Sequence, residues 1–158
     1  MNLTVIRASF AAQVAAYASP SLRTLAEPED QVNPPVGIVM PGRPYVTYGS
    51  TLQGETGFGP VLGAAASTPL SETNFNLDFL IVLSHASTLE RVEQNLDAWL
   101  GVENDGTAVS VAAAVGADPT LGGTVRWCEP VTADPPGPLA WNGPEAFGTR
   151  IHFQLSAL

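Results

Sequence analysis

The chain contains no lysine and few charged residues of any kind. Charged side chains make up 13% of its 158 residues, about half of the ~25% that is usual in soluble domains. Its six basic residues are all arginines and face fifteen acidic residues, for a formal net charge of −9. Binding to nucleic acid or to an anionic membrane surface depends on clustered cations. The composition therefore argues against both partners, and so uncharged an exterior favours burial against other subunits.

Cysteine and long apolar runs are also scarce. The single cysteine, Cys128, excludes an internal disulfide and a cysteine-cluster zinc site. The longest strongly apolar run, Phe79–Leu83, is far shorter than the roughly 18–20 residues of a membrane span. The amino-terminal segment contains Arg7 and no uninterrupted apolar core, so we expect no secretory signal. Hydrophobic residues make up 45% of the chain, and we expect one soluble, intracellular domain over residues 1–158.

Apolar residues at helical spacing predict three helices. The first covers Leu3–Ala18, with Asn2 as its N-cap and Pro20 beyond its end. The second begins at a capping box formed by Ser87 and Glu90 and ends at Gly101, where a left-handed residue is favoured. Its apolar stripe consists of Leu89, Val92, Leu96, Trp99 and Leu100. The third, over Thr107–Val115, is built from small and β-branched residues and should lie against a sheet.

Alternating and β-rich segments predict five strands, at Val36–Met40, Tyr45–Tyr48, Phe75–Ser84, Thr124–Pro130 and Phe147–Leu155. Phe75–Ser84 has the clearest alternation, and its second half is apolar on both faces. Residues Gln53–Glu72 show no period, and the proline-rich stretch Pro130–Pro144 reads as a rigid loop. The order of elements predicts an α+β fold: a single domain with long loops and an antiparallel-rich sheet with helices packed on one side.

Motifs for catalysis are weak. The segment Gly54–Gly59 superficially resembles a phosphate-binding loop, but it lacks the lysine, and Pro60 follows where a helix should begin. Ser84 and His85, with Asp78 upstream, suggest a nucleophile and a base. Adjacent side chains of an extended chain point apart, however, so a structural role is favoured. We predict no catalytic residue.

The sequence also shows only weak signals for a metal or cofactor site. His85 and His152 are the only histidines, and neither has a second ligand at short spacing, so a metal site would need convergence over long range. The acidic turn Glu103–Gly106 lacks the rest of a calcium loop, and we expect Asp105 to cap the following helix. Nothing near Cys128 in the sequence would lower its pKa, so a half-buried strand residue is expected there. We predict neither metal nor cofactor.

Aromatic residues in loops and edge strands are the better candidates for function. Such residues often anchor interfaces between proteins. The candidates are Tyr45, Tyr48, Phe58 and Trp141, whereas Trp127 is expected to cover the edge of the domain's own core.

The order of elements and several short strings resemble the tail terminator proteins of long-tailed bacteriophages. The resemblance covers most of the chain, and its most family-like part is the string D-P-T-L-G-G after a helix with leucine-aspartate-x-aromatic-leucine. The matching pieces are the alanine-rich opening helix, the proline-bounded strand Pro35–Pro41, the apolar strand around Phe79–Val82, the helix carrying Leu96–Leu100, the small-residue helix opened by Ser110, the string Asp118–Gly123 and the terminal strand.

The resemblance implies a structural virion protein that caps the head-proximal end of the tail tube as a ring, typically of six subunits. Its partners would be further copies of itself, the tail tube protein and the head connector protein, after a stay in the host cytoplasm. DNA would pass through the ring without sequence-specific binding, and an acidic wall would repel its phosphates. Candidates for such a lumen are Glu27, Glu29, Asp30, Glu103 and Asp105, although acidic side chains on solvated faces are equally compatible with the sequence.

Three rival functions stay open at this point. Another connector component, such as a head-closure or head-tail joining protein, fits the composition equally well. A small ligand-binding domain or enzyme would need converging polar groups, for which the chain offers two histidines and no lysine. An adhesin is the third. For the terminator, we expect the Gln53–Glu72 loop and the edge strand Tyr45–Tyr48 to contact neighbouring subunits or the tube, so that deleting Gly54–Ser67 leaves a folded monomer that cannot cap tubes.

Overall fold

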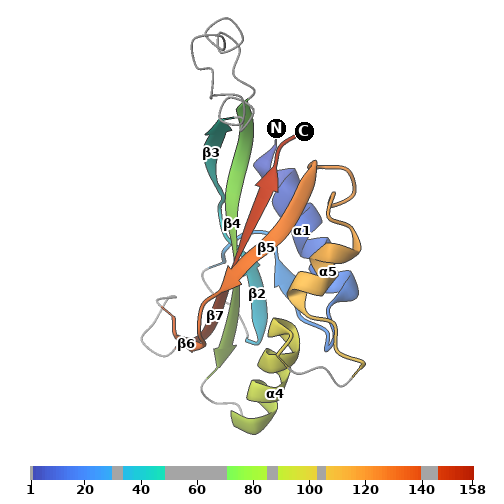
Figure 1. The fold of residues 1–158 in the computed structure, drawn as a ribbon. Helices are drawn as coiled ribbons and strands as arrows, with labels where there is room; N and C mark the ends of the chain where they lie inside the picture. Colours follow the sequence, from blue (N-terminus) through green and yellow to red (C-terminus); the bar gives the residue numbers. More distant parts are fainter. Residues whose placement is uncertain (1, 30–33, 49–70, 85–88, 103–105, 140–145) are drawn as a thin grey trace, which may run out of the picture.

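The computed structural model of the chain describes residues 2–29, 34–48, 71–84, 89–102, 106–139 and 146–158. These residues form three helices and one seven-stranded mixed sheet (Figure 1). The helices are α1 (Leu3–Tyr17), α4 (Leu89–Leu100) and α5 (Val111–Ala117); the strands are β1 (Thr24–Leu25), β2 (Val36–Val39), β3 (Arg43–Tyr48), β4 (Ser71–Ser84), β5 (Trp127–Ala133), β6 (Gly137–Pro138) and β7 (Ala146–Ser156). The predicted α+β class is confirmed.

Strand β4 is the central element of the sheet. Its 14 residues pair with β7 along one side, while β3 and β2 share the other side. The order is β1-β2-β4-β7-β5, with β3 added to β4 and β6 added to β7. Every pairing is antiparallel except β1 with β2. The long strand therefore connects the two halves of the sheet, and the antiparallel character predicted from the sequence is confirmed.

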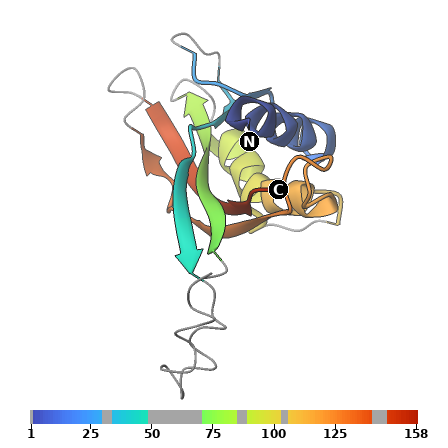
Figure 2. The same cartoon turned by 90° about the horizontal axis from the view of Figure 1, so that it is seen from above.

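The alternation along β4 places its aromatic residues toward the helices, which lie together on one side of the sheet (Figure 2). Phe79 is fully buried there, and its ring centroid lies 5.6 Å from that of Phe10 on α1. Phe10 also meets Phe153 of β7 edge-on at 4.9 Å. Trp99 of α4 is 1% exposed and donates its indole N–H to the carbonyl of Pro20. The main core thus lies between the sheet and its helices.

A second, smaller apolar cluster lies on the opposite face of the sheet. It consists of Val36 and Ile38 from β2 and Leu80 and Val82 from β4, and all four are buried. Partly buried side chains pack around it, among them Leu139, which follows β6. This cluster explains why the second half of β4 is apolar on both faces.

The ends of two helices confirm their predicted signals. The side chain of Asn2 accepts hydrogen bonds from the amides of Thr4 and Val5, and α1 ends at Tyr17, one residue earlier than predicted. Gly101 has a φ of +78°, the left-handed conformation expected after α4. The predicted capping box at Ser87 lies outside the described residues.

The start of the third helix was predicted wrongly. Helix α5 begins at Val111, and the hydroxyl of Ser110 caps it by accepting from the amide of Ala113. The residues before it cannot be helical, because Val109 exchanges backbone hydrogen bonds with Ser19. The N-cap of α5 is therefore Ser110 and not Asp105. The expectation that Ser110 opens the small-residue helix is confirmed.

Strand boundaries also differ from the prediction. Strand β5 begins at Trp127 rather than Thr124, because a tight turn occupies the preceding residues. It continues to Ala133, and β6 follows, so the predicted rigid loop Pro130–Pro144 is wrong over its first part. Proline is compatible with β5 because this strand lies at the edge of the sheet. Ser71 and Glu72, predicted to be loop, belong to β4; residues 53–70 lie outside the described part of the chain.

Candidate functional site

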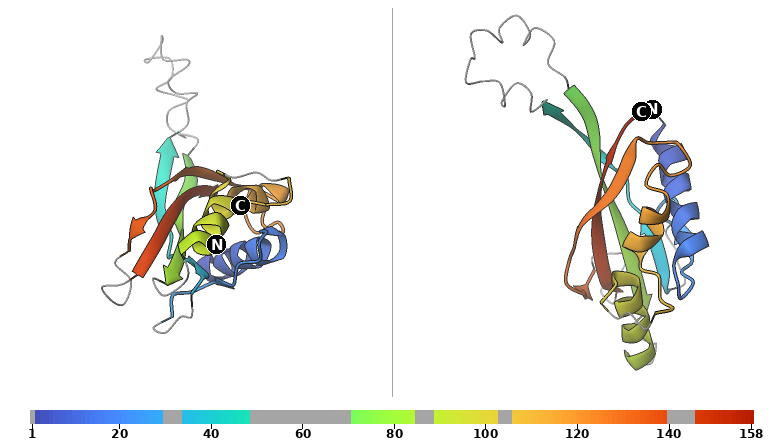
Figure 3. Two further views of the ribbon diagram at one scale, coloured as in Figure 1. Left: turned by 90° about the horizontal axis from the view of Figure 1, so that it is seen from below. Right: turned by 45° about the vertical axis from the view of Figure 1, so that its right-hand side comes forward.

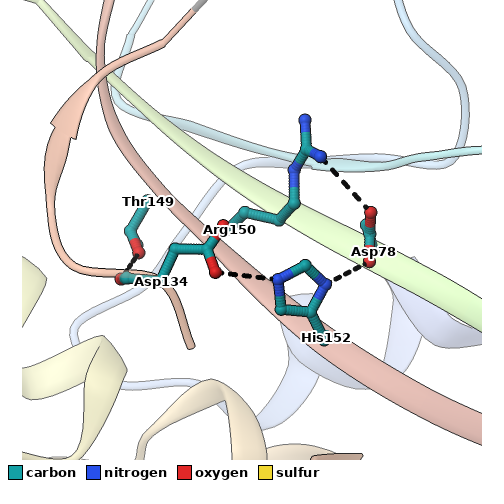
Figure 4. Close-up of polar contacts among 5 residues, drawn as sticks. All are labelled: Asp78, Asp134, Thr149, Arg150 and His152. Carbon is teal, nitrogen blue, oxygen red and sulfur yellow. Dashed lines mark hydrogen bonds and ion pairs between the residues drawn. The ribbon is translucent and has the colours of Figure 1, made fainter. Parts of the chain in front are cut away.

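Three polar side chains, from β4, from β7 and from the residue after β5, meet on the sheet face away from the helices (Figure 4). Asp78 of β4 and His152 of β7 are direct cross-strand partners. The Nδ1 atom of His152 lies 2.7 Å from Oδ1 of Asp78, and its Nε2 atom lies 2.9 Å from Oδ1 of Asp134, which follows β5. Arg150 of β7 adds an ion pair, with Nη1 3.6 Å from Oδ2 of Asp78. One imidazole thus bridges two carboxylates.

A β-bulge in β5 sets the position of Asp134. The register pairs Glu129 with Gln154 and Thr132 with His152, so two steps along β7 are matched by three steps along β5. Such an extra residue bends the strand and changes which side chains share a face. Two hydrogen bonds of its own backbone also fix the position of Asp134. Its amide donates to the carbonyl of Arg150 at 2.8 Å, and its carbonyl accepts from Oγ1 of Thr149 at 2.6 Å.

The geometry favours the doubly protonated form of the His152 ring. An ionised carboxylate can only accept hydrogen bonds, so both ring nitrogens must donate, and an imidazole that donates from both carries a positive charge. The hydrogen bond to Asp134 raises the pKa of His152, and the contacts with Asp78 raise it further, against the opposing effect of partial burial. The arrangement therefore favours the imidazolium form of His152 between the two carboxylates.

This arrangement leaves little for catalysis or metal binding at His152. Both ring nitrogens are engaged, so neither can accept a proton from a nucleophile or coordinate an ion without breaking the cluster. Among the described residues, no group of three or more histidine, cysteine, aspartate or glutamate side chains is arranged to hold a metal ion. Asp78, considered above with Ser84 and His85, contacts His152 and Arg150 instead, and His85 lies outside the described residues.

The string Asp118–Gly123 forms a self-contained turn between α5 and β5. One carboxylate oxygen of Asp118 accepts from the amide and hydroxyl of Thr120, at 3.0 and 2.6 Å, and the other accepts from the amide of Gly122 at 2.8 Å. These bonds, the Thr120 hydroxyl first, lower the pKa of Asp118. Leu121 takes a φ of +50° and is 1% exposed, so the turn inserts it into the core. The string Asp118–Gly123 is therefore a structural turn.

The structure describes only some of the predicted interface residues. Tyr45 lies half-buried on β3, opposite Asn74. Tyr48 ends the same strand, but its side chain is outside the described part, as are Phe58 and Trp141. Trp127 is half-buried on β5, beside the core to which Cys128 belongs.

Two of the candidate lumen acids have arginine neighbours. Glu27 lies 3.3 Å from Arg7, and Glu29 lies 4.0 Å from Arg23. Both glutamates are more than half exposed, and exposed pairs of this kind contribute little to stability. Asp30, Glu103 and Asp105 lie outside the described residues. Of these five acids the structure describes only Glu27 and Glu29, and each of them lies beside an arginine.

Cys128 is more deeply buried than the sequence predicted. It is 2% exposed, and burial raises the pKa of its thiol to about 12, with a smaller contribution from the neighbouring charge of Glu129. Nucleophilic cysteines need a low pKa. The expectation that nothing lowers the pKa of Cys128 is confirmed.

Two surface hollows of about 310 Å³ each lie away from the His152 cluster. One is bounded by Ser19 and Pro20 after α1, by α4 and by Thr107 and Ala108. The other is mostly apolar and lies where the two ends of the chain meet, lined by Asn2, Val5, Ile6, Thr124 and Leu158. Neither gathers charged side chains.

The cluster around His152 was missed by the sequence prediction, which treated His152 and Asp78 separately and did not single out Asp134. A partial signal was present, because the alternation in each strand places His152 and Asp78 on a polar face. Only the register of β4, β7 and β5 brings them together, and the bulge that places Asp134 is not visible in the residue pattern.

No protein-family model matches the sequence, and no curated protein matches it either. None of the helices in the described part of the chain is long and apolar enough to cross a membrane.

Proposed function

We propose that the chain is a structural protein of a long-tailed bacteriophage that forms a ring on the head-proximal end of the tail tube. This ring ends tube polymerisation and joins the tail to the head connector. The proposal rests on the resemblance of the sequence to tail terminators and on one structural observation, the shape of the β3–β4 ladder. The single-domain α+β fold is compatible with this role.

The β3–β4 ladder extends away from the helix-covered body. Figure 3 shows β3 and the adjoining part of β4 running outward, away from α1 and α5. Among the described strands, β3 pairs only with β4. Its outer edge therefore presents backbone donors and acceptors, and such an edge is a template for pairing with another chain.

The opposite edge of the sheet is less suited to pairing. Strand β5 carries the bulge between Pro130 and Thr132, and Pro135 and Pro136 follow it. Bulges and prolines are devices that prevent strands from adding to an edge. In β3 the charge and the proline are confined to the first two residues, Arg43 and Pro44, and Tyr45–Tyr48 contains neither. Unequal edges favour heterologous contacts, in which one patch of a subunit meets a different patch of its neighbour until a ring closes.

The charge balance supports a conduit for DNA rather than a DNA-binding surface. Each chain carries a formal net charge of −9, and a ring multiplies this charge by its number of subunits. An excess of negative charge repels phosphate and lets DNA pass without adhering. The pairing of Glu27 and Glu29 with arginines weakens their own contribution, so the proposal does not depend on them.

A matched pair of lysine substitutions tests the edge. Tyr45→Lys places a charge on the β3 edge, whereas Val131→Lys places one on β5, where Val131 is already 54% exposed. Particle mass is measured for each protein alone and after mixing with tail tubes. We expect Tyr45→Lys to abolish association and Val131→Lys to retain it. Thermal unfolding of both variants verifies that each is folded.

The same mixtures separate the proposal from its rivals. A terminator binds tubes and, by electron microscopy, sits at the head-proximal end of tails even when heads are missing. A head-closure or joining protein would be absent from such tails. An unmodified chain that stays monomeric and never joins tubes would contradict the proposed function altogether.

A further inference from the structure

The segment after β5 is attached to the sheet by backbone hydrogen bonds and by one charged side chain. Asp134 begins this segment, its carboxylate contacts Nε2 of His152, and His152 is anchored on its other side by Asp78. The segment continues through β6, which pairs with Gly148 and Phe147, to Leu139, which packs on the small apolar cluster of Val36, Ile38, Leu80 and Val82. The contact at His152 thus lies at the start of the segment that reaches this cluster.

We propose that His152 is a proton-dependent latch that holds the segment 134–139 on the open face of the sheet. The reason is the number of protons that the geometry needs. A neutral imidazole carries one N–H, so it can donate to Asp78 or to Asp134 but not to both. The ring nitrogen that loses its proton then points a lone pair at a carboxylate oxygen, and that contact becomes repulsive.

Asp134 makes the longer and more exposed of the two carboxylate contacts, although its hydrogen bond contributes most to the raised pKa of His152. Its side chain is 53% exposed against 30% for Asp78, and its contact with His152 is longer. Asp78 also retains Arg150 when His152 becomes neutral. Deprotonation of His152 should therefore release the Asp134 carboxylate first. Asp134 then keeps two hydrogen bonds, from its backbone amide to the carbonyl of Arg150 and from the Thr149 hydroxyl to its own carbonyl.

The other charges near the latch do not substitute for His152. Facing it are Asp78 on β4, Arg150 on β7 and Asp134 after β5. Arg43 on β3 and Glu129 on β5 belong to the neighbouring row of cross-strand partners, with Asn76 and Gln154 between them. Since the contacts raise the pKa of His152 above its ordinary value, the latch is fully closed below the unfolded-state pKa of about 6.5 and opens as pH rises through the folded-state value.

Nuclear magnetic resonance of the whole protein tests the latch without any substitution. The nitrogen shifts of the His152 ring are followed from pH 5 to 9, with a His85→Gln variant to assign the two histidines. We expect both ring nitrogens to be protonated up to a pH above the ordinary range of histidine. When the pH rises further and the ring loses a proton, the amide protection factor of Asp134 should fall about threefold. This loss is modest because the Asp134 carboxylate is half exposed. A His152 ring that is already neutral near pH 6 would overturn the proposal.

Two matched substitutions make the test specific. In Asp134→Asn, the amide nitrogen can donate to a neutral Nε2, so the contact no longer needs the second proton. We expect His152 to titrate at lower pH and the amide protection of residue 134 to lose its dependence on pH. Glu129→Gln removes a carboxylate from the same strand and should change neither. An Asp134→Asn variant with an unchanged His152 titration would refute the latch, and if it fails to fold, the measurement on the unmodified protein still decides.

Discussion

On the sheet face that the helices cover, Phe10, Phe79 and Phe153 pack ring against ring and are essentially excluded from water. On the opposite face, at the same level of the sheet, Asp78 and His152 hold their contact while about 30% exposed. The first arrangement depends on burial of apolar area, which does not change with pH. The second depends on one proton. Strands β4 and β7 contribute to both, so a substitution on one strand tests either face according to its position.

The largest effect is expected on the covered face. Phe153→Ala would leave a cavity beside Phe10, since Phe153 is 1% exposed and its ring contacts that of Phe10. Loss of this side chain should lower the free energy of unfolding by about 3–5 kcal/mol. Urea denaturation at pH 6 and pH 9 measures it, and the loss should be equal at the two values. A loss that differs strongly between them would contradict the division of the faces.

A smaller, pH-dependent effect is expected on the open face. Asp78→Asn removes the carboxylate partner of both His152 and Arg150, and we expect a loss of about 1 kcal/mol at pH 6, reduced by partial solvent exposure. The raised pKa of His152 means that the part of this stability contributed by the imidazolium is present at low pH and is lost as pH rises through that pKa, while the ion pair with Arg150 remains. The loss measured by urea denaturation should therefore be smaller at pH 9, and a loss that grows with pH would contradict the sign.

The two faces also differ in how far the sequence predicts them. The covered face follows from alternation, because Phe75, Leu77 and Phe79 repeat with a period of two and must lie together. The fold class and the N-cap at Asn2 follow in the same local way. The His152 cluster depends on cross-strand register and on the bulge before Thr132, and neither has a local signal. The prediction of where α5 starts was wrong for a related reason, because the pairing of Val109 with Ser19 joins segments far apart in the chain.

The smallest effect is expected two residues from the latch on the same strand. Gln154 shares the open face with His152 and is partly exposed, but its cross-strand partners are the uncharged Asn76 and the exposed Glu129. Gln154→Ala should change the free energy of unfolding by no more than about 0.5 kcal/mol at any pH, as is usual for surface positions without special contacts. Urea denaturation of this variant beside Asp78→Asn separates two explanations of the open face. If both variants lose stability equally and with the same pH dependence, the whole polar row stabilises the sheet; if only Asp78→Asn responds to pH, the effect belongs to the imidazolium and its two carboxylates.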